Sequence, residues 1–200
     1  MKSRMHLKKK IVICVVICIT VLAGTFVTIN LYILLSTPKQ YMITTENYID
    51  YQPHYECSGY ASAYVLRSLG EDAHGLELYN DIFNKNNDGT VPTVTLVEFL
   101  AEKGYSVKLR SGTTMQLKHE ISKGTPVIVL VRTAPHEDYY HYLPIVGYDE
   151  ENIYAADSLK YKENAKNEYY NRIIGNSDFD KMWETGVFRK NTYITIRLDN

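Results

Sequence analysis

Residues 52–70 read Q-P-H-Y-E-C-S-G-Y-A-S-A-Y-V-L-R-S-L-G and contain Cys57, the only cysteine outside the apolar run of residues 11–35. After Cys57, apolar residues between Ala61 and Leu69 recur at three- and four-residue steps, which predicts a helix. Gly70 supplies a C-terminal stop for that helix. Cys57 is therefore expected near a helix N-terminus, a position that favours a thiolate.

A histidine and an aspartate lie in strand-like runs further along the chain. His141 begins H-Y-L-P-I-V-G-Y, and Asp157 ends N-I-Y-A-A-D. If these runs are adjacent antiparallel strands, the carboxylate can hold the imidazole while the imidazole moves the thiol proton to a leaving amine. The backbone N–H of Cys57 and the side-chain amide of Gln52 would supply two oxyanion donors. These four residues predict an acyl-transfer site.

Each of these residues also has a simpler interpretation. An isolated cysteine is commonly a buried small hydrophobe. His141 could be a surface residue among tyrosines, Asp157 could start a turn with Ser158, and Gln52 could be an ordinary loop residue. The occurrence of all four in this order is what favours a catalytic site over the separate alternatives.

The remaining histidines of the domain do not indicate a metal site. Their positions give no spacing that would satisfy zinc. They are His54, His74, His119 and His136. We therefore expect no metal and no cofactor.

The first 35 residues differ in composition from the rest of the chain. Residues 1–10 contain five Lys and Arg, and residues 11–35 contain no charged side chain. As a helix, residues 11–35 would be roughly 37 Å long, enough to cross a hydrocarbon core of about 30 Å. We interpret residues 1–10 as a cytoplasmic basic tail and 11–35 as one transmembrane helix. The alternative is a cleaved secretory signal, with V-L-A at residues 21–23 as its cleavage site.

The distribution of charge bears on location and partners. Because Lys and Arg crowd the N-terminal side of the apolar run, the positive-inside rule predicts a single-pass cell-membrane protein with an extracytoplasmic domain. Residues 36–200 hold 17 basic and 23 acidic side chains, a net charge near −6, which argues against a nucleic-acid partner. Frequent Lys, Asn, Ile and Tyr hint at a bacterial source.

Along the domain the hydrophobic pattern changes from helical to strand-like spacing. After the helix at Cys57, we expect helices over 76–83, 95–103 and 114–122. We expect strands over 126–133, 141–148, 152–157 and 192–198. This order predicts an α+β domain over residues 48–200, joined to the apolar helix by a stalk over residues 36–47. The polar residues 160–176 are expected to be one long connection, either a lid or a surface excursion.

At these residues the chain resembles the papain-like cysteine peptidases, and among them the bacteriocin-processing, double-glycine leader peptidase family and its relatives. The resemblance rests on Gln52 ahead of Cys57 and on the run C-x-x-x-x-S-x-x-V-L-x-x-L-G that follows. It continues in H-Y-L-P-I-V-G-Y-D, in N-I-Y-A-A-D-S and in F-x-x-x-W after Asp157. The resemblance covers nearly all of residues 48–198.

The resemblance implies a papain-like fold with the cysteine on a helical part and the histidine and aspartate on a mostly antiparallel sheet. It implies Cys57 as nucleophile, His141 as base and acid, Asp157 as the orienting residue and Gln52 as an oxyanion donor. Two features depart from the family pattern: the glycine that usually follows the cysteine directly is delayed to Gly59, and Gln52 precedes Cys57 by five residues rather than six. The sequence also lacks the G-x-x-x-x-G-K-[ST] loop of the ATPase that transporter-linked members carry.

The leading hypothesis is a membrane-anchored, extracytoplasmic cysteine peptidase that cleaves a peptide or protein substrate through a Cys57 thioester. One alternative is a catalytically inactive module that binds a peptide or protein on the same fold, motivated by the two departures around Cys57. Another is an acyltransferase that uses the same thiol, because the acyl-enzyme is common to hydrolysis and transfer.

Overall fold

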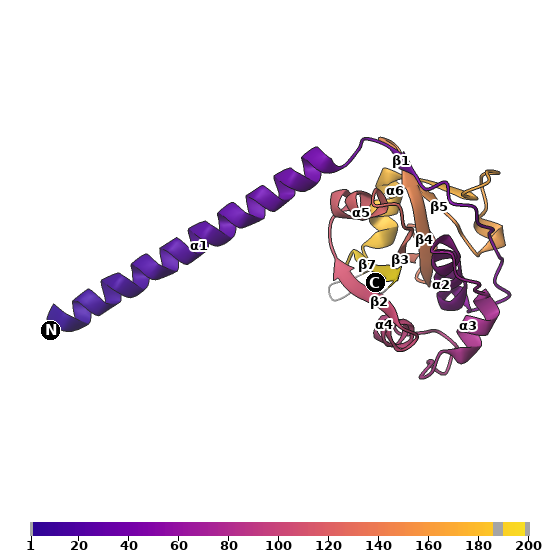
Figure 1. Ribbon diagram of the computed structural model, residues 1–200, viewed down its shortest axis with the longest axis horizontal. Coiled ribbons are helices and arrows are strands. Elements are labelled where there is room, and N and C mark those ends of the chain that lie inside the picture. Colours follow the sequence, from indigo (N-terminus) through magenta and orange to yellow (C-terminus); the bar gives the residue numbers. More distant parts are fainter. Residues whose placement is uncertain (1, 186–189, 199–200) are drawn as a thin grey trace. The chain divides into compact units, whose positions relative to one another are not determined.

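The computed structural model describes residues 2–185 and 190–198, which divide into two units between Thr37 and Pro38 (Figure 1). The first unit is a single helix. The second unit contains a twisted sheet with helices on both faces, and it holds all four residues that the sequence predicts to form a site.

Helix α1 spans Lys2–Ser36, and its portion Ile11–Ser36 has a mean hydropathy of 2.8. Polar side chains in this portion satisfy their hydrogen bonds on the helix itself. The hydroxyls of Thr20, Thr25 and Thr28 each donate to the carbonyl four residues earlier, at 2.9 Å. Such internal bonding suits a segment that has no water around it. By length and composition the helix fits a membrane span, and an N-terminal signal sequence has the same properties.

Helix α2 (Cys57–Ser68) begins at the cysteine, as predicted. Its apolar stripe faces the core, where Ala61 is 1% exposed. The chain leaves the helix through Gly70, whose φ of +90° lies in the left-handed region that favours glycine. The N–H of Glu71 returns to the carbonyl of Leu66 at 3.1 Å, which completes the stop that the sequence predicts.

The other predicted helices are also confirmed, with small shifts at their ends. They are α3 (Gly75–Asp81), α4 (Thr93–Glu102) and α5 (Thr114–Ile121). Helix α5 begins with a capping box, in which Thr113 and Gln116 bond each other's backbone N–H groups. A further helix, α6 (Asn176–Trp183), carries the F-x-x-x-W phrase, and η1 (Lys160–Lys162) is a single 3-10 turn.

Within the described residues, seven strands form one antiparallel sheet in the order β2-β7-β3-β4-β5-β6, with β1 paired to β4. They are β1 (Tyr41–Met42), β2 (Tyr105–Ser111), β3 (Val127–Arg132), β4 (Tyr140–Tyr148), β5 (Asn152–Ala155), β6 (Arg172–Gly175) and β7 (Thr192–Leu198). Strands β3 to β6 follow one another as antiparallel neighbours. One end of the sheet therefore holds the end of β3, the start of β4, the end of β5 and the start of β6.

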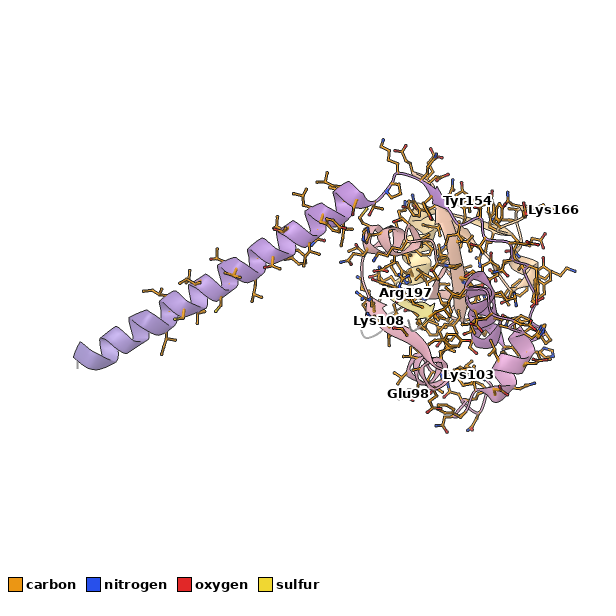
Figure 2. The ribbon with its side chains drawn as sticks, in the orientation of Figure 1. Glu98, Lys103, Lys108, Tyr154, Lys166 and Arg197 are labelled. Atoms are coloured by element: carbon orange, nitrogen blue, oxygen red, sulfur yellow. The ribbon has the colours of Figure 1, made fainter. Side chains whose placement is uncertain are left out.

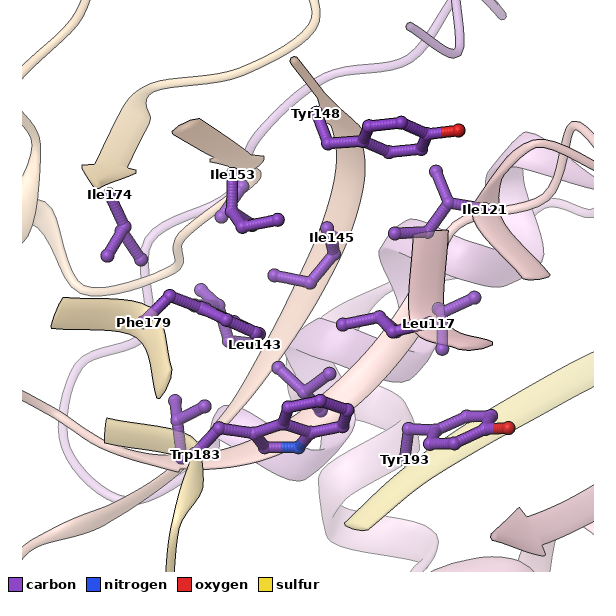
Figure 3. Close-up of a cluster of buried hydrophobic side chains, with 14 of the residues drawn as sticks. Leu117, Ile121, Leu143, Ile145, Tyr148, Ile153, Ile174, Phe179, Trp183 and Tyr193 are labelled. Atoms are coloured by element: carbon purple, nitrogen blue, oxygen red, sulfur yellow. The ribbon is translucent and has the colours of Figure 1, made fainter. Parts of the chain in front are cut away.

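Both faces of the central strands are buried, which explains their continuous apolar runs. On β3, Val129 and Val131 join the core under α5 and α6, which also contains Phe179 and Trp183 (Figure 3). Ile128, on the opposite face of β3, joins the core under α2 and α4. This alternation follows from the two-residue period of a strand. The sheet is thus clamped between two helical layers, one of which carries Cys57.

Strand β2 forms one edge of the sheet and pairs with β7 along its length. Its outward-facing cations include Lys108, which lies near Arg197 of β7 (Figure 2). Charged side chains on an edge strand oppose pairing with another chain. This edge is on the far side of the sheet order from β5 and β6.

The structure differs from the sequence-based expectations in three places. Residues expected to form a stalk instead supply β1, and Ile43 is 6% exposed against the sheet. The polar residues 160–176 contain η1 and strand β6 rather than one unstructured connection. Strand β2 was not expected at all, because half-exposed edge strands have a weak apolar pattern.

Candidate active site

Cys57 is the first residue of α2 and is partly buried against the α2–α4 core. Its N–H lies in the first turn, where backbone donors have no acceptor within the helix. Glu56 is the N-cap residue, and its carbonyl accepts from the N–H of Gly59 at 2.9 Å. The start of α2 therefore presents a thiol together with a backbone donor.

The delayed glycine has a packing role at its own position. A Cβ on Gly59 would lie 2.3 Å from the carbonyl oxygen of Gly75 and 2.6 Å from Cβ of Tyr79. Helices α2 and α3 can approach this closely only because residue 59 has no side chain. Gly59 is thus explained by the contact between the two helices rather than by the thiol.

His141 and Asp157 meet at the end of the sheet where β4 begins and β5 has just ended. The Nε2 of His141 lies 2.9 Å from Oδ1 of Asp157, and both side chains are almost completely buried. Asp157 thus occupies the Nε2 atom of the His141 ring. The Cys57 side chain is a second hydrogen-bond partner of His141. The structure therefore brings the predicted cysteine, histidine and aspartate together in that order.

Electrostatics favour the charged forms of this pair. Burial alone would lower the pKa of His141, but the charge and hydrogen bond of Asp157, followed by those of Cys57, raise it to about 9. Burial alone would raise the pKa of Asp157, but the charge and hydrogen bond of His141, with help from Arg172, lower it to about 2. At neutral pH the pair is an imidazolium and a carboxylate, so His141 holds a proton that it can donate.

Two consecutive residues that the sequence did not point to bind Asp157: Asn171, just before β6, and Arg172, its first residue. The side chain of Asn171 bonds the backbone of Asp157 on both sides, accepting from its N–H at 2.7 Å and donating to its carbonyl at 2.8 Å. The guanidinium of Arg172 donates to Oδ2 of Asp157 at 2.6 Å and to the carbonyl of Thr133 at 2.8 Å. The backbone N–H of Leu159 donates to Oδ1 of Asp157 at 2.8 Å.

Gln52 lies beside this cluster but is committed to other contacts. Its backbone N–H donates to the carbonyl of Ser158 at 3.0 Å, and its Oε1 accepts from the Ser158 hydroxyl at 2.6 Å. Its Nε2 donates to the carbonyl of His54 at 2.7 Å. An amide nitrogen carries two N–H donors, so one donor of Gln52 is used within its own loop. The structure places Gln52 next to the residue that follows Asp157.

The loops around the site are tied to one another. Lys162 Nζ lies 2.9 Å from both carboxylate oxygens of Glu137, which joins the segment after β5 to the turn between β3 and β4. The Tyr51 hydroxyl donates to Glu163 at 2.7 Å, which joins the loop before α2 to that same segment. A surface hollow of about 390 Å³ is lined by Tyr51, Glu163 and Asn171 among other residues. The hollow thus reaches the residue that holds Asp157.

The described part of the chain holds no group of three or more His, Cys, Asp or Glu side chains arranged to bind a metal ion. The clustered groups are instead a thiol, an imidazole and a carboxylate. Such a set can transfer an acyl group and move a proton.

Comparison with known proteins gives the family. A profile described as the Peptidase C39 like family matches residues 40–190. The chain belongs to this family. The resemblance drawn from the motifs around Cys57, His141 and Asp157 is thereby confirmed. None of the curated proteins compared with the chain matches it significantly.

Solved structures of C39-like peptidases share the fold at low sequence identity. The peptidase domain of Streptococcus ComA, a bifunctional ABC transporter of a quorum-sensing pathway, superposes with a TM-score of 0.60 at 14% identity, covering 77% of this chain and 99% of its own. A putative C39-like peptidase from Bacillus anthracis gives 0.59 at 16% identity, covering 79% and 98%. A double-glycine motif protease from an AMS/PCAT transporter, solved with the leader peptide, gives 0.57 at 16% identity, covering 78% and 94%. The expected α+β fold, with a helical N-terminal part and an antiparallel sheet, is confirmed.

Sequence reasoning missed Asn171 and Arg172 because nothing in a polar run marks a residue as buried. Arg172 is 7% exposed and Asn171 is 5% exposed, although both lie in the stretch expected to be a lid or a surface excursion. The one available signal was the short apolar run R-I-I-G at Arg172–Gly175, which resembles a strand. A strand there would pair with β5 and bring its first residue close to Asp157.

Proposed function

We propose that this C39-like protein is a membrane-anchored cysteine peptidase whose domain cleaves peptide bonds outside the cytoplasm. The observation that carries the proposal is the buried His141–Asp157 pair beside Cys57, which begins helix α2. The family match supports a cysteine peptidase. The apolar helix α1, with its N-terminal cations, supports the anchor and the outward orientation.

In the proposed reaction, the Cys57 proton resides on His141 and the sulfur attacks the carbonyl carbon of the scissile amide. The resulting oxyanion accepts hydrogen bonds from the N–H of Cys57 and from the second amide N–H of Gln52. His141 then protonates the leaving amine, and a thioester remains on Cys57. A water molecule attacks the thioester, gives a proton to His141 and releases a carboxylic acid. Asp157 keeps the imidazole in the tautomer and orientation that each step requires.

A peptide is the proposed substrate class. One structural relative is described as bound to a leader peptide, so a peptide with a double-glycine motif is the first candidate to test on this chain. An amine acceptor in place of water would turn the same thioester into an acyl-transfer intermediate. Product analysis by mass spectrometry distinguishes the free acid from the transferred acyl group.

The test is the pH dependence of iodoacetamide labelling in the full-length chain, purified in detergent micelles. Peptide mapping scores Cys57 separately from Cys14 and Cys18, which serve as internal controls on α1. We expect fast labelling of Cys57 well below about pH 8, and slow labelling in the His141→Ala variant. The same preparation is then incubated with double-glycine peptides, with Cys57→Ala as the inactive control.

A slow, ordinary labelling profile for Cys57, together with no cleavage of any peptide, would contradict the peptidase proposal. The second candidate is the inactive binding module. It is favoured by the hydrogen bond from Gln52 to the His54 carbonyl, which uses one N–H of the amide expected to donate to the oxyanion. For such a module, calorimetry should show that the peptide binds, and product analysis should show that it is not cleaved.

A further inference from the structure

Arg172 has a side chain that is almost wholly buried, at 8% exposure. It opens strand β6, where the register places it opposite Ala155, two residues before Asp157. From there its guanidinium reaches two acceptors, Oδ2 of Asp157 and the carbonyl of Thr133. Thr133 directly follows β3 and closes the turn that leads to β4 and His141.

We infer that Arg172 is a positioning residue for the proposed reaction, because it binds both Asp157 and the turn before His141. The inference rests on the proposed function, since it assigns to Arg172 the task of aiming Asp157 at the histidine. Its guanidinium bonds the Asp157 carboxylate and the Thr133 carbonyl, so Arg172 acts by holding these two groups. Asn171 assists by fixing the backbone of Asp157 on both sides.

The geometry gives each oxygen of Asp157 a separate task. Oδ1 accepts from His141 at 2.9 Å and from the N–H of Leu159 at 2.8 Å, while Oδ2 accepts from Arg172 at 2.6 Å. A carboxylate held at both oxygens cannot rotate about its Cβ–Cγ bond without breaking a charge-assisted hydrogen bond. Without the guanidinium, Oδ2 would lose its charge-assisted hydrogen bond while it stays buried. The loss of this bond would favour the protonated form of the Asp157 carboxyl.

A second buried arginine offers a matched comparison. The side chain of Arg67 is also 8% exposed, and it donates to the carbonyls of Tyr48 and Ala73 and to the carboxylate of Asp50. It lies on α2, so it supports the same domain, but it contacts neither His141 nor Asp157. A purely structural arginine should therefore behave like Arg67 when it is replaced.

The experiment compares Arg172→Met, Arg172→Lys and Arg67→Met in the full-length chain in micelles. We expect Arg172→Met to lower kcat about 10²-fold with little change in KM, as a small misplacement of catalytic groups can do. The acid limb of its pH–rate profile should move to higher pH, because the Asp157 carboxyl loses a cation. Arg172→Lys keeps the positive charge but loses the planar guanidinium that bonds two acceptors at once. The acid limb of its pH–rate profile should therefore stay near that of the wild type, while kcat stays reduced. Arg67→Met should lower stability without moving the pH profile.

A readout independent of turnover separates this inference from the proposed function. In chains labelled with [13C]aspartate, the Asp157 carboxyl, assigned with Asp157→Asn, should stay ionised in the wild type down to about pH 3. It should titrate above that pH in Arg172→Met. If the wild type proves inactive, this titration still decides whether Arg172 holds Asp157 ionised.

Either of two results would overturn the inference. One is an Arg172→Met enzyme whose kcat and pH profile match those of Arg67→Met. The other is an Asp157 carboxyl that titrates identically in the wild type and in Arg172→Met. If Arg172→Met fails to fold, an unchanged kcat in Arg172→Lys overturns the inference equally, because a lysine cannot bond both acceptors as the guanidinium does.

Discussion

The half of the site that lies on the sheet is held by more contacts than the half that lies on α2. The carboxylate of Asp157 accepts hydrogen bonds from His141, Arg172 and the backbone of Leu159, and its side chain is fully buried. On α2, by contrast, Cys57 is partly exposed, and the neighbouring Ser58 has a buried hydroxyl without a hydrogen-bond partner.

This difference indicates which part of the proposed chemistry is prepared before a substrate arrives. A fully bonded network in a low-dielectric environment resists rearrangement, so the proposed acid–base pair is preorganised. The proposed oxyanion donors are only partly assembled, since Gln52 shares its amide with the His54 carbonyl. Hydrogen bonds of that kind often align only in the complex with substrate. Substitutions in each half can test this division.

The largest effect is expected from Asp157→Asn, which breaks the tightly held half. Turnover should fall by about 10⁴, because an asparagine favours the wrong tautomer of His141. Stability should fall as well, by about 3–5 kcal/mol, since Arg172 would be left as a buried cation without its anion. Peptide cleavage and urea unfolding measure the two effects separately.

Asp50→Asn is the control for that stability loss. Asp50 pairs with the buried Arg67 but is itself 34% exposed, so water can replace it. Its replacement should have a smaller effect on unfolding and none on turnover. A turnover rate near that of the wild type in Asp157→Asn would remove Asp157 from the mechanism.

Gln52→Ala tests the loosely held half. If its amide completes the oxyanion hole in the complex, kcat should fall by about 10²–10³. The pH–rate profile should keep its shape, because Gln52 contacts neither His141 nor the carboxylate of Asp157. Ser158→Ala removes only the hydroxyl that donates to Gln52 Oε1, so it should have a smaller effect. Equal losses in the two variants would instead mean that Gln52 acts by holding the loop.

The same division explains how far the sequence could predict the site. The sequence could predict that Cys57, His141 and Asp157 lie together, because each lies in or next to an element with a regular apolar pattern and adjacent antiparallel strands bring their ends together. Arg172 and strand β6 were missed because a buried ion pair is visible only through its partner in space. Gln52 was named from a motif, but its contacts depend on a loop conformation that no periodicity specifies.

The stability of the domain should fall at alkaline pH, through the tightly held pair. The folded-state pKa of His141, about 9, lies above its ordinary value of 6.5, so its contribution is complete below pH 6.5 and is lost as the pH rises through 9. That loss is on the order of 3 kcal/mol. Asp157, with a folded-state pKa of about 2 against an ordinary 3.8, contributes above pH 3.8 and loses its contribution as the pH falls through 2.

Urea unfolding at several pH values between 6 and 10 measures the alkaline loss, and Cys57→Ala assigns its source. Because Asp157 raises the pKa of His141 more than Cys57 does, most of the loss should persist without the thiol. It should vanish in Asp157→Asn. If Cys57→Ala abolishes the pH dependence, the histidine is coupled mainly to the cysteine, and the comparison between the two halves must be reversed.

The smallest expected effect is at Ser58, on the loosely held half. Ser58→Ala removes a buried hydroxyl that has no partner, so the free energy of unfolding should stay the same or rise by up to about 1 kcal/mol. Ser62→Ala is the matched control on the same helix, because that buried hydroxyl donates to the Ser58 carbonyl at 2.7 Å, and its loss should destabilise by about 1 kcal/mol. Opposite signs at the two serines would identify the Ser58 hydroxyl as a polar group that the folded domain does not use.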